Sequence, residues 1–299
     1  MLPKSLLVAC LLSLAPLPLA AAQDARLRVA VSILPQQFLV ERIAGDRVEV
    51  LTLVQPGDNE ATYSPGPATL AALDGARAWF TMGVHFEDAW LARITRDRPG
   101  LEIVPLAEGL PLRDIEAEVG SHDHAGDAAG RSDPHAWTDP RLAARMAARI
   151  ADMLARLDPA GAVEYAAAAA ELQAELLALH EELAALLAPV RGRAFIVFHP
   201  SWGYFADAYG LVQVPIETGG REPGPRGLAE VIRRGRETGA RAVFVQDQFS
   251  QRSARAVAEA LGAQVVTADP LALDYADNLR RVAERIAAAL GGPAPGAAR

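Results

Sequence analysis

Cysteine is almost absent from this chain of 299 residues, in which Cys10 is the only one. Cys10 lies in an apolar N-terminal stretch that we expect to be removed from the mature protein. Without other cysteines, the mature chain has neither a disulfide framework nor a thiolate metal site. Side chains with nitrogen and oxygen donors are therefore the ones to examine for chemistry.

Long apolar runs are also missing beyond the first residues. Residues 1–22 are typical of a secretory signal peptide, with Lys4 as the basic region, an apolar core from Leu6 to Leu19, and small residues before the cleavage site. An alternative is a lipoprotein signal, because Leu7-Val8-Ala9-Cys10 resembles a lipobox, but very little apolar sequence precedes that cysteine. Both interpretations send the chain out of the cytoplasm, and we favour the periplasm.

An excess of basic residues is lacking as well, since the net charge is −8. That charge argues against nucleic acid as a partner and is compatible with a cation as the ligand. The apolar fraction of 51% and the charged fraction of 22% indicate a packed globular protein, and the length suggests about two domains.

The familiar catalytic motifs are missing. The sequence has no G-x-S-x-G elbow, no H-E-x-x-H helix and no glycine-rich phosphate loop. His199, Asp269 and Ser201 could form a hydrolase triad, but nothing exposes the serine as a nucleophile. We therefore predict that the protein is not an enzyme.

Residues 158–189 are predicted to form one long helix. Leucines recur with helical spacing at Leu172, Leu176, Leu179, Leu183 and Leu186, in a segment rich in alanine and glutamate. Asp158 suits the N-cap, Pro159 the first helical position and Pro189 the end. A coiled-coil segment is the alternative, although the run is short for sustained heptads. Strand-and-helix alternation on both sides favours a rigid helix that joins two lobes.

The alternation itself predicts an α/β fold. Short apolar strands alternate with helices in residues 23–157, the N-terminal lobe, and again in residues 190–292, the C-terminal lobe. We expect each lobe to contain a mostly parallel sheet flanked by helices, and residues 293–299 to be a disordered tail. A polar loop at 118–133 precedes the segment Asp133-Pro134-His135.

Three side chains are candidates for a site between the lobes. His199 and Asp269 each follow a predicted strand directly, and ligands of such folds bind beyond the carboxyl ends of the strands. His135, at the start of a helix, would reach the same crevice from the first lobe. Two imidazoles and a carboxylate suit Zn²⁺.

At this point the chain resembles a known family, the zinc- and manganese-type solute-binding proteins of ABC transporters. The resemblance is carried, in order, by the segments VAVSILPQQFLVERIAGDRVEV, QPGDNEATYSPGP, MGVHFEDAW, DPHAWTDPRLAARMA, VFHPSWGYFADAYGL and TADPLALDY. It implies two lobes joined by one helix, a metal ion in the cleft, and delivery to a permease in the inner membrane. We expect the receptor to be a monomer in the periplasm.

The resemblance also implies the ligands. Family ligands fall on His135, His199 and Asp269, and the imidazole at His199, where manganese-type members have a carboxylate, favours Zn²⁺ over Mn²⁺. Zinc-type members usually have a further histidine where this chain has Ala61. Glu60 or His85 could replace it with equal merit, and Asp58 or water are further possibilities.

Two questions stay open at the level of sequence. His122 and His124, in the polar loop, could capture metal weakly or could belong to a simple linker. The alternative function is binding of a bulky metal chelate of the siderophore type, for which Trp202, Tyr204 and Arg221 lie near suitable strand ends.

Overall fold

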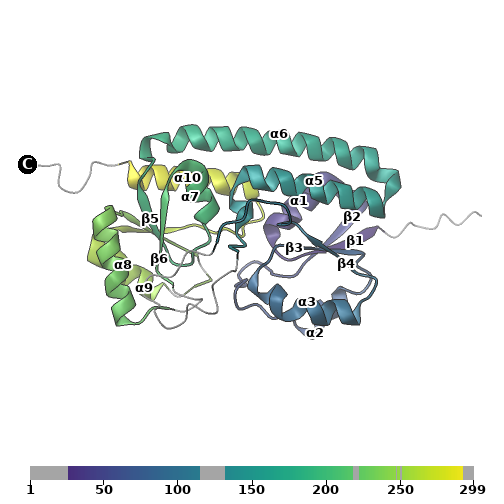
Figure 1. Ribbon diagram of the computed structural model, residues 1–299, viewed down its shortest axis with the longest axis horizontal. Coiled ribbons are helices and arrows are strands. Elements are labelled where there is room, and N and C mark those ends of the chain that lie inside the picture. The colour runs from purple at the N-terminus through teal and green to yellow at the C-terminus, as the bar shows by residue number, and fades with distance from the viewer. Residues whose placement is uncertain (1–25, 115–131, 218–221, 247, 250, 292–299) are drawn as a thin grey trace, which may run out of the picture.

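The computed structural model describes residues 26–114, 132–217, 222–246, 248–249 and 251–291. The predicted signal peptide (1–22), Cys10, His122, His124, Arg221 and the tail (293–299) lie outside the described residues. Two four-stranded parallel sheets lie side by side beneath one long helix, as Figure 1 shows. This is the α/β architecture that the sequence predicts.

The first sheet has the strand order β2-β1-β3-β4. Its strands are β1 (Leu27–Val31), β2 (Val48–Thr52), β3 (Ala78–Thr81) and β4 (Glu102–Pro105). The helices of this lobe are α1 (Leu34–Ala44), α2 (Pro67–Ala72), α3 (His85–Asp97) and α5 (Pro140–Leu157). All strands are parallel, so the loops that leave their carboxyl ends share one edge of the sheet.

The second sheet repeats this arrangement with the order β6-β5-β7-β8. Its strands are β5 (Ala194–Val197), β6 (Val212–Pro215), β7 (Ala242–Val245) and β8 (Gln264–Thr267). Its helices are α7 (Gly203–Tyr209), α8 (Pro225–Thr238), α9 (Arg252–Leu261) and α10 (Tyr275–Leu290). The central strands β5 and β7 are buried along their whole length, as expected when helices cover both faces.

The long helix is α6 (Ala162–Leu187), extended by a 3₁₀ turn at each end, Pro159–Gly161 and Ala188–Val190. Its buried stripe is Tyr165, Ala169, Leu172, Leu176, Leu179, Leu183 and Leu187. Of the helically spaced leucines, Leu186 lies off this stripe, because its exposed fraction is 37% and Leu187 completes the stripe one full turn after Leu183. The stripe packs on α5 and α1 of the first lobe and on α10 of the second.

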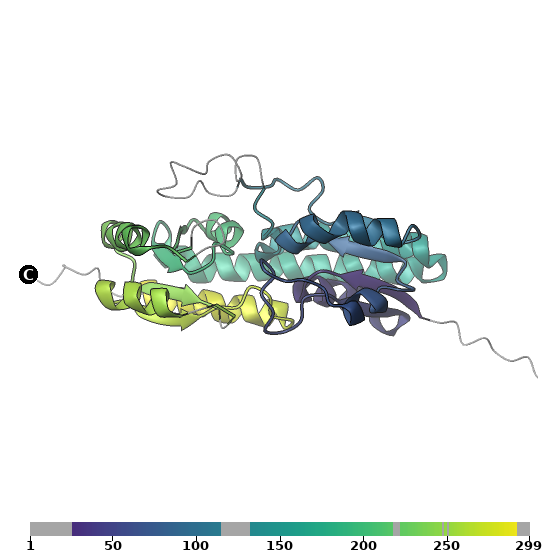
Figure 2. The same cartoon turned by 90° about the horizontal axis from the view of Figure 1, so that it is seen from below.

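Further contacts hold the lobes together beneath α6. The indole Nε1 of Trp137 donates to the carbonyl of Pro270 at 2.8 Å, and the Tyr275 hydroxyl donates to the carbonyl of Trp137 at 2.6 Å. The ring of Phe38 stacks on that of Tyr275, with centroids 5.4 Å apart. These contacts fix the lobes side by side, as Figure 2 shows from below. Among the described residues, none of the helices has the length and apolarity needed to cross a membrane.

Candidate metal site

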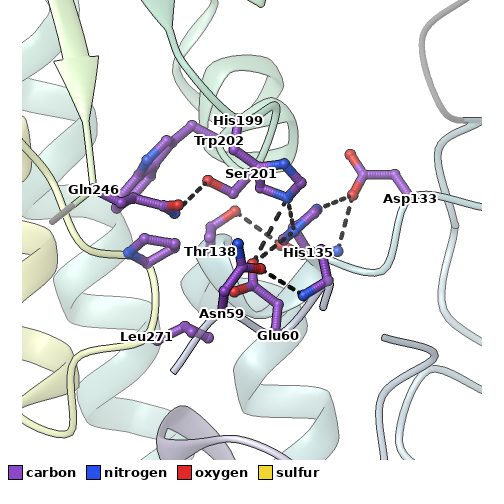
Figure 3. Close-up of polar contacts among 12 residues, drawn as sticks. Asn59, Glu60, Asp133, His135, Thr138, His199, Ser201, Trp202, Gln246 and Leu271 are labelled. Atoms are coloured by element: carbon purple, nitrogen blue, oxygen red, sulfur yellow. Dashed lines mark hydrogen bonds and ion pairs between the residues drawn. The ribbon is translucent and has the colours of Figure 1, made fainter. Parts of the chain in front are cut away.

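Glu60, His135 and His199 converge between the two lobes (Figure 3). The Nε2 atoms of His135 and His199 are 3.3 Å apart. Oε1 of Glu60 lies 3.8 Å from Nε2 of His135 and 3.7 Å from Nε2 of His199. All three side chains are buried. Among the described residues they form the one group whose possible metal-binding atoms lie within 4.8 Å of one another.

Glu60 lies in the loop that follows β2, and local turns fix its place. Oδ2 of Asp58 accepts a hydrogen bond from the backbone N–H of Gln55, and Oδ1 of Asn59 accepts one from that of Ala61. Asn and Asp side chains stabilise turns in this way. The loop therefore presents Glu60 inward, while Asp58 is used in the turn itself.

His135 precedes a 3₁₀ turn (Ala136–Thr138) that leads into α5. Its Nδ1 lies 2.7 Å from Oδ1 of Asp133, and the same oxygen accepts its backbone N–H at 2.9 Å. A histidine whose Nδ1–H donates to a carboxylate keeps the lone pair of Nε2 free for a metal ion. Asp133 thus orients the ring and selects its tautomer.

His199 follows β5, and its partner comes from the neighbouring strand. Its Nδ1 lies 3.1 Å from the nearer oxygen of Glu217, which follows β6. The parallel pairing continues past the strands, since the N–H of Glu217 donates to the carbonyl of Phe198 at 2.9 Å. The ring of Phe249 stacks on the His199 imidazole, with centroids 5.3 Å apart. His199 is therefore held on two sides with Nε2 facing His135.

The charges in this group favour an ionised carboxylate beside an imidazole. Burial opposes ionisation of Glu60, yet contact with His135 and the charge of His199 hold its pKa below the usual range. Burial disfavours the charged form of His135, but Asp133 and Glu60 outweigh it and raise its pKa to about 9. Without a metal ion, both ring nitrogens of His135 therefore carry a proton at neutral pH, and the ring is positively charged.

The donor set fits zinc. Two nitrogens bound to Zn²⁺ at about 2.0–2.1 Å with a tetrahedral angle are about 3.3 Å apart, as the two Nε2 atoms are here. Oε1 of Glu60 is buried and has no hydrogen-bond partner among the described residues. A buried carboxylate oxygen without such a partner is unfavourable unless a cation binds it. Glu60 therefore completes a set of three donors.

Of the two side chains predicted to replace the missing histidine, the structure brings Glu60 into the group and not His85. His85 is the first residue of α3 and is exposed. Asp269, predicted beside His135 and His199, follows β8 as expected but lies outside the group. Its Oδ1 accepts the N–H of Leu271 at 2.9 Å, and its carbonyl accepts the side-chain amide of Asn278. One oxygen of this carboxylate therefore takes part in the turn after β8, and the assignment of Asp269 as a metal ligand stays a prediction.

The alternatives from the sequence find little support. Ser201 is fully buried, and its Oγ accepts a hydrogen bond from Gln246 rather than facing an imidazole base. Both ring nitrogens of His199 face other groups, so the triad with Asp269 does not form. Trp202 and Tyr204, proposed for a chelate, are buried, with exposed fractions of 2% and 4%.

Asp133 and Glu217 are the functional residues that sequence reasoning missed. The signal for Asp133 was its place two residues before a predicted ligand, within Asp133-Pro134-His135. The signal for Glu217 was its place at the end of the strand next to that of His199. Carboxylates that hydrogen-bond to ligating imidazoles are the usual outer shell of a metal site.

Comparison with known proteins identifies relatives over nearly the whole chain. The sequence model of the family described as "Zinc-uptake complex component A periplasmic" matches residues 29–289. The high-affinity zinc uptake system protein ZnuA of Paracoccus denitrificans is 30% identical over 331 aligned positions, which cover 97% of this chain and 98% of that protein.

Solved structures agree. A crystal structure of ZnuA superposes with a TM-score of 0.81 at 40% identity, covering 89% of this chain and 99% of that one. A zinc-bound deletion mutant of ZnuA gives a TM-score of 0.82 at 39% identity, covering 90% and 100%. The two-lobed fold is thus shared with structures of substantial sequence identity.

Proposed function

This chain belongs to the family of periplasmic A components of zinc-uptake complexes, and from that premise we propose that it captures Zn²⁺ between its lobes and delivers it to an ABC-transporter permease. Zinc is the substrate that the protein carries. The family is a transport component, so no catalytic activity is assigned.

The observation that carries the proposal is the convergence of Glu60, His135 and His199 on one buried point. One lobe supplies Glu60 and His135, and the other supplies His199, so an ion bound there joins the two lobes. Two nitrogen donors favour zinc over manganese, which prefers oxygen. The fourth ligand, from Asp269 or from water, stays a prediction.

The remaining parts of the proposal concern the setting. The family is periplasmic, and we propose that residues 1–22 direct export and are then cleaved, with lipid anchoring as the alternative. We also propose that the receptor is a monomer, that its permease lies in the inner membrane, and that residues 23–157, 158–189 and 190–292 form the first lobe, the linking helix and the second lobe.

The test is metal binding by the mature protein after removal of metal with a chelator. Elemental analysis and calorimetry should give a single equivalent of bare Zn²⁺ per chain and weaker binding of Mn²⁺. His199→Ala should abolish tight binding. His180→Ala is the matched control, because His180 lies on α6 stacked on Tyr209, away from the group. Full zinc affinity in His199→Ala would overturn the site, and a requirement for an organic chelate would favour the siderophore class.

A further inference from the structure

Arg113 joins the two lobes next to the candidate metal site. It lies in the first lobe, after β4, and its Nε pairs with Oδ2 of Asp207 on α7 at 3.2 Å. Its guanidinium also lies 5.8 Å from the ring centroid of Tyr204, on the same helix. The side chain is mostly buried, with an exposed fraction of 18%. The partner carboxylate is exposed, with an exposed fraction of 62% for Asp207, so water and salt screen this ion pair and it adds modestly to the other contacts of Arg113.

Tyr204 of α7 also contacts the backbone of the segment that leads to His135. The hydroxyl of Tyr204 accepts the N–H of Arg113 at 2.9 Å and donates to the carbonyl of Asp133 at 2.8 Å. The N–H of Asp133 donates to the carbonyl of Arg113, also at 2.8 Å. The backbone groups of Arg113 and Asp133 and the Tyr204 hydroxyl therefore form a closed ring of three hydrogen bonds between the first lobe and α7, and the Arg113 side chain adds the ion pair to Asp207.

Gly203 makes the close approach possible. A β-carbon at this position would lie 3.0 Å from Oδ2 of Asp133 and closer still to the guanidinium of Arg113. The first residue of α7 thus packs against both side chains, with no room for a larger residue. Oδ1 of Asp133 remains directed at His135.

We propose that Arg113 and Tyr204 are positioning residues that hold the Asp133–His135 pair against α7 and thereby fix the separation of the two imidazoles. The geometry gives the reason, because His199 lies only four residues before Gly203, at the entry to the same helix. His135 is connected to α7 through Asp133, which contacts Tyr204 and Gly203 of that helix. His199 is connected to α7 directly through the short stretch of chain between it and Gly203. The distance between their Nε2 atoms is then set by this short path rather than by the flexibility of α6.

This inference rests on the proposed function, and its test uses the full mature protein with Zn²⁺. Tyr204→Phe removes the bridging hydroxyl, and Arg113→Gln removes the interlobe ion pair. Each should lower zinc affinity by about tenfold or more, as loss of outer-shell support typically does. Arg42→Gln is the matched control, since Arg42 pairs with Glu175 on α6 far from the site, and it should leave affinity unchanged.

A double-mutant cycle distinguishes positioning from general destabilisation. If Arg113 acts through Asp133, Arg113→Gln should have little further effect on zinc affinity in an Asp133→Asn background. Arg113→Lys, which keeps the charge but not the planar fork, guards against a variant that does not fold and should fall between wild type and Arg113→Gln. Fully additive effects, or near-wild-type affinity in both Tyr204→Phe and Arg113→Gln, would overturn the inference. Failure of the wild-type protein to bind zinc would instead overturn the proposed function.

Discussion

The Nε2 atoms of His135 and His199 face each other across the two lobes at 3.3 Å. Two imidazole lone pairs at that distance repel unless a proton or a cation lies between them. Each Nδ1 is already occupied by a carboxylate, Asp133 for one ring and Glu217 for the other. The metal-binding atoms are therefore preorganised, and capture of an ion requires exchange of a proton more than movement of the lobes.

Zinc binding should release a proton from His135. Its pKa is raised to about 9, so the imidazole is charged at pH 7.5 in the metal-free protein and must lose that proton to bind a cation. Zinc affinity should fall about tenfold per pH unit below about 9. Calorimetry at pH 7.5 in buffers of different ionisation enthalpy measures the release directly. An enthalpy that does not depend on the buffer would contradict this prediction.

Glu60→Gln should weaken zinc binding by on the order of a hundredfold or more, because loss of a direct ligand exceeds the 10–100-fold effect of outer-shell losses. The amide keeps the size of the side chain and removes its charge. Asp58→Asn is the control in the same loop, since Asp58 accepts the Gln55 N–H and lies outside the group. Competition with a chromophoric chelator gives both affinities. Equal weakening in the two variants would point to the loop rather than to the Glu60 carboxylate.

The fold could be predicted from the sequence because its strands and helices differ clearly in period. The short helix α7 (Gly203–Tyr209) was not predicted, since seven residues provide less than the usual evidence of helical spacing. At the level of sequence, its Tyr204 could line a chelate-binding cleft. In the structure Tyr204 is buried and its hydroxyl forms hydrogen bonds with the backbone of Arg113 and Asp133, so packing rather than ligand contact explains it.

The site was predictable only in part, for a similar reason. Strand ends place His199 and Asp269 at the correct edges of the sheet, but sequence does not reveal which carboxylate a turn will use. Asp269 accepts the N–H of Leu271, whereas Glu60, in an irregular loop, has an oxygen without such a partner among the described residues. Such tertiary details explain why Glu60 faces the two imidazoles, whereas the role of Asp269 as a further ligand stays a prediction.

Glu217→Gln should lower zinc affinity by about 10–100-fold, although Glu217 lies outside the group of donors. The amide can donate a hydrogen bond to Nδ1 of His199, which would place the proton on Nε2 and block its lone pair. The expected signature is a changed tautomer of His199 in ¹⁵N NMR spectra together with faster zinc release. Glu222→Gln is the control, because Glu222 accepts the hydroxyl of Ser253 instead. An unchanged tautomer with weakened binding would refute the mechanism.

The last prediction concerns stability rather than metal. Glu87 is buried at the start of α3, where its carboxylate accepts the N–H groups of Met82 and Gly83, and burial raises its pKa from 4.5 to about 7. The folded state binds this proton more tightly than the unfolded state does. The contribution to stability is therefore complete below pH 4.5 and is lost as the pH rises through 7, a change of about 3 kcal/mol.

Glu87→Gln is neutral at every pH and should not show this loss. The free energy of unfolding of the variant, relative to wild type, should rise by about 3 kcal/mol between pH 4 and pH 8. Urea titrations of the metal-free proteins at several pH values measure that difference, and contributions from His135 and Glu60 cancel because both proteins contain them. A difference that stays constant with pH would mean that the pKa of Glu87 is the same in the folded and unfolded protein, with the two backbone donors offsetting its burial.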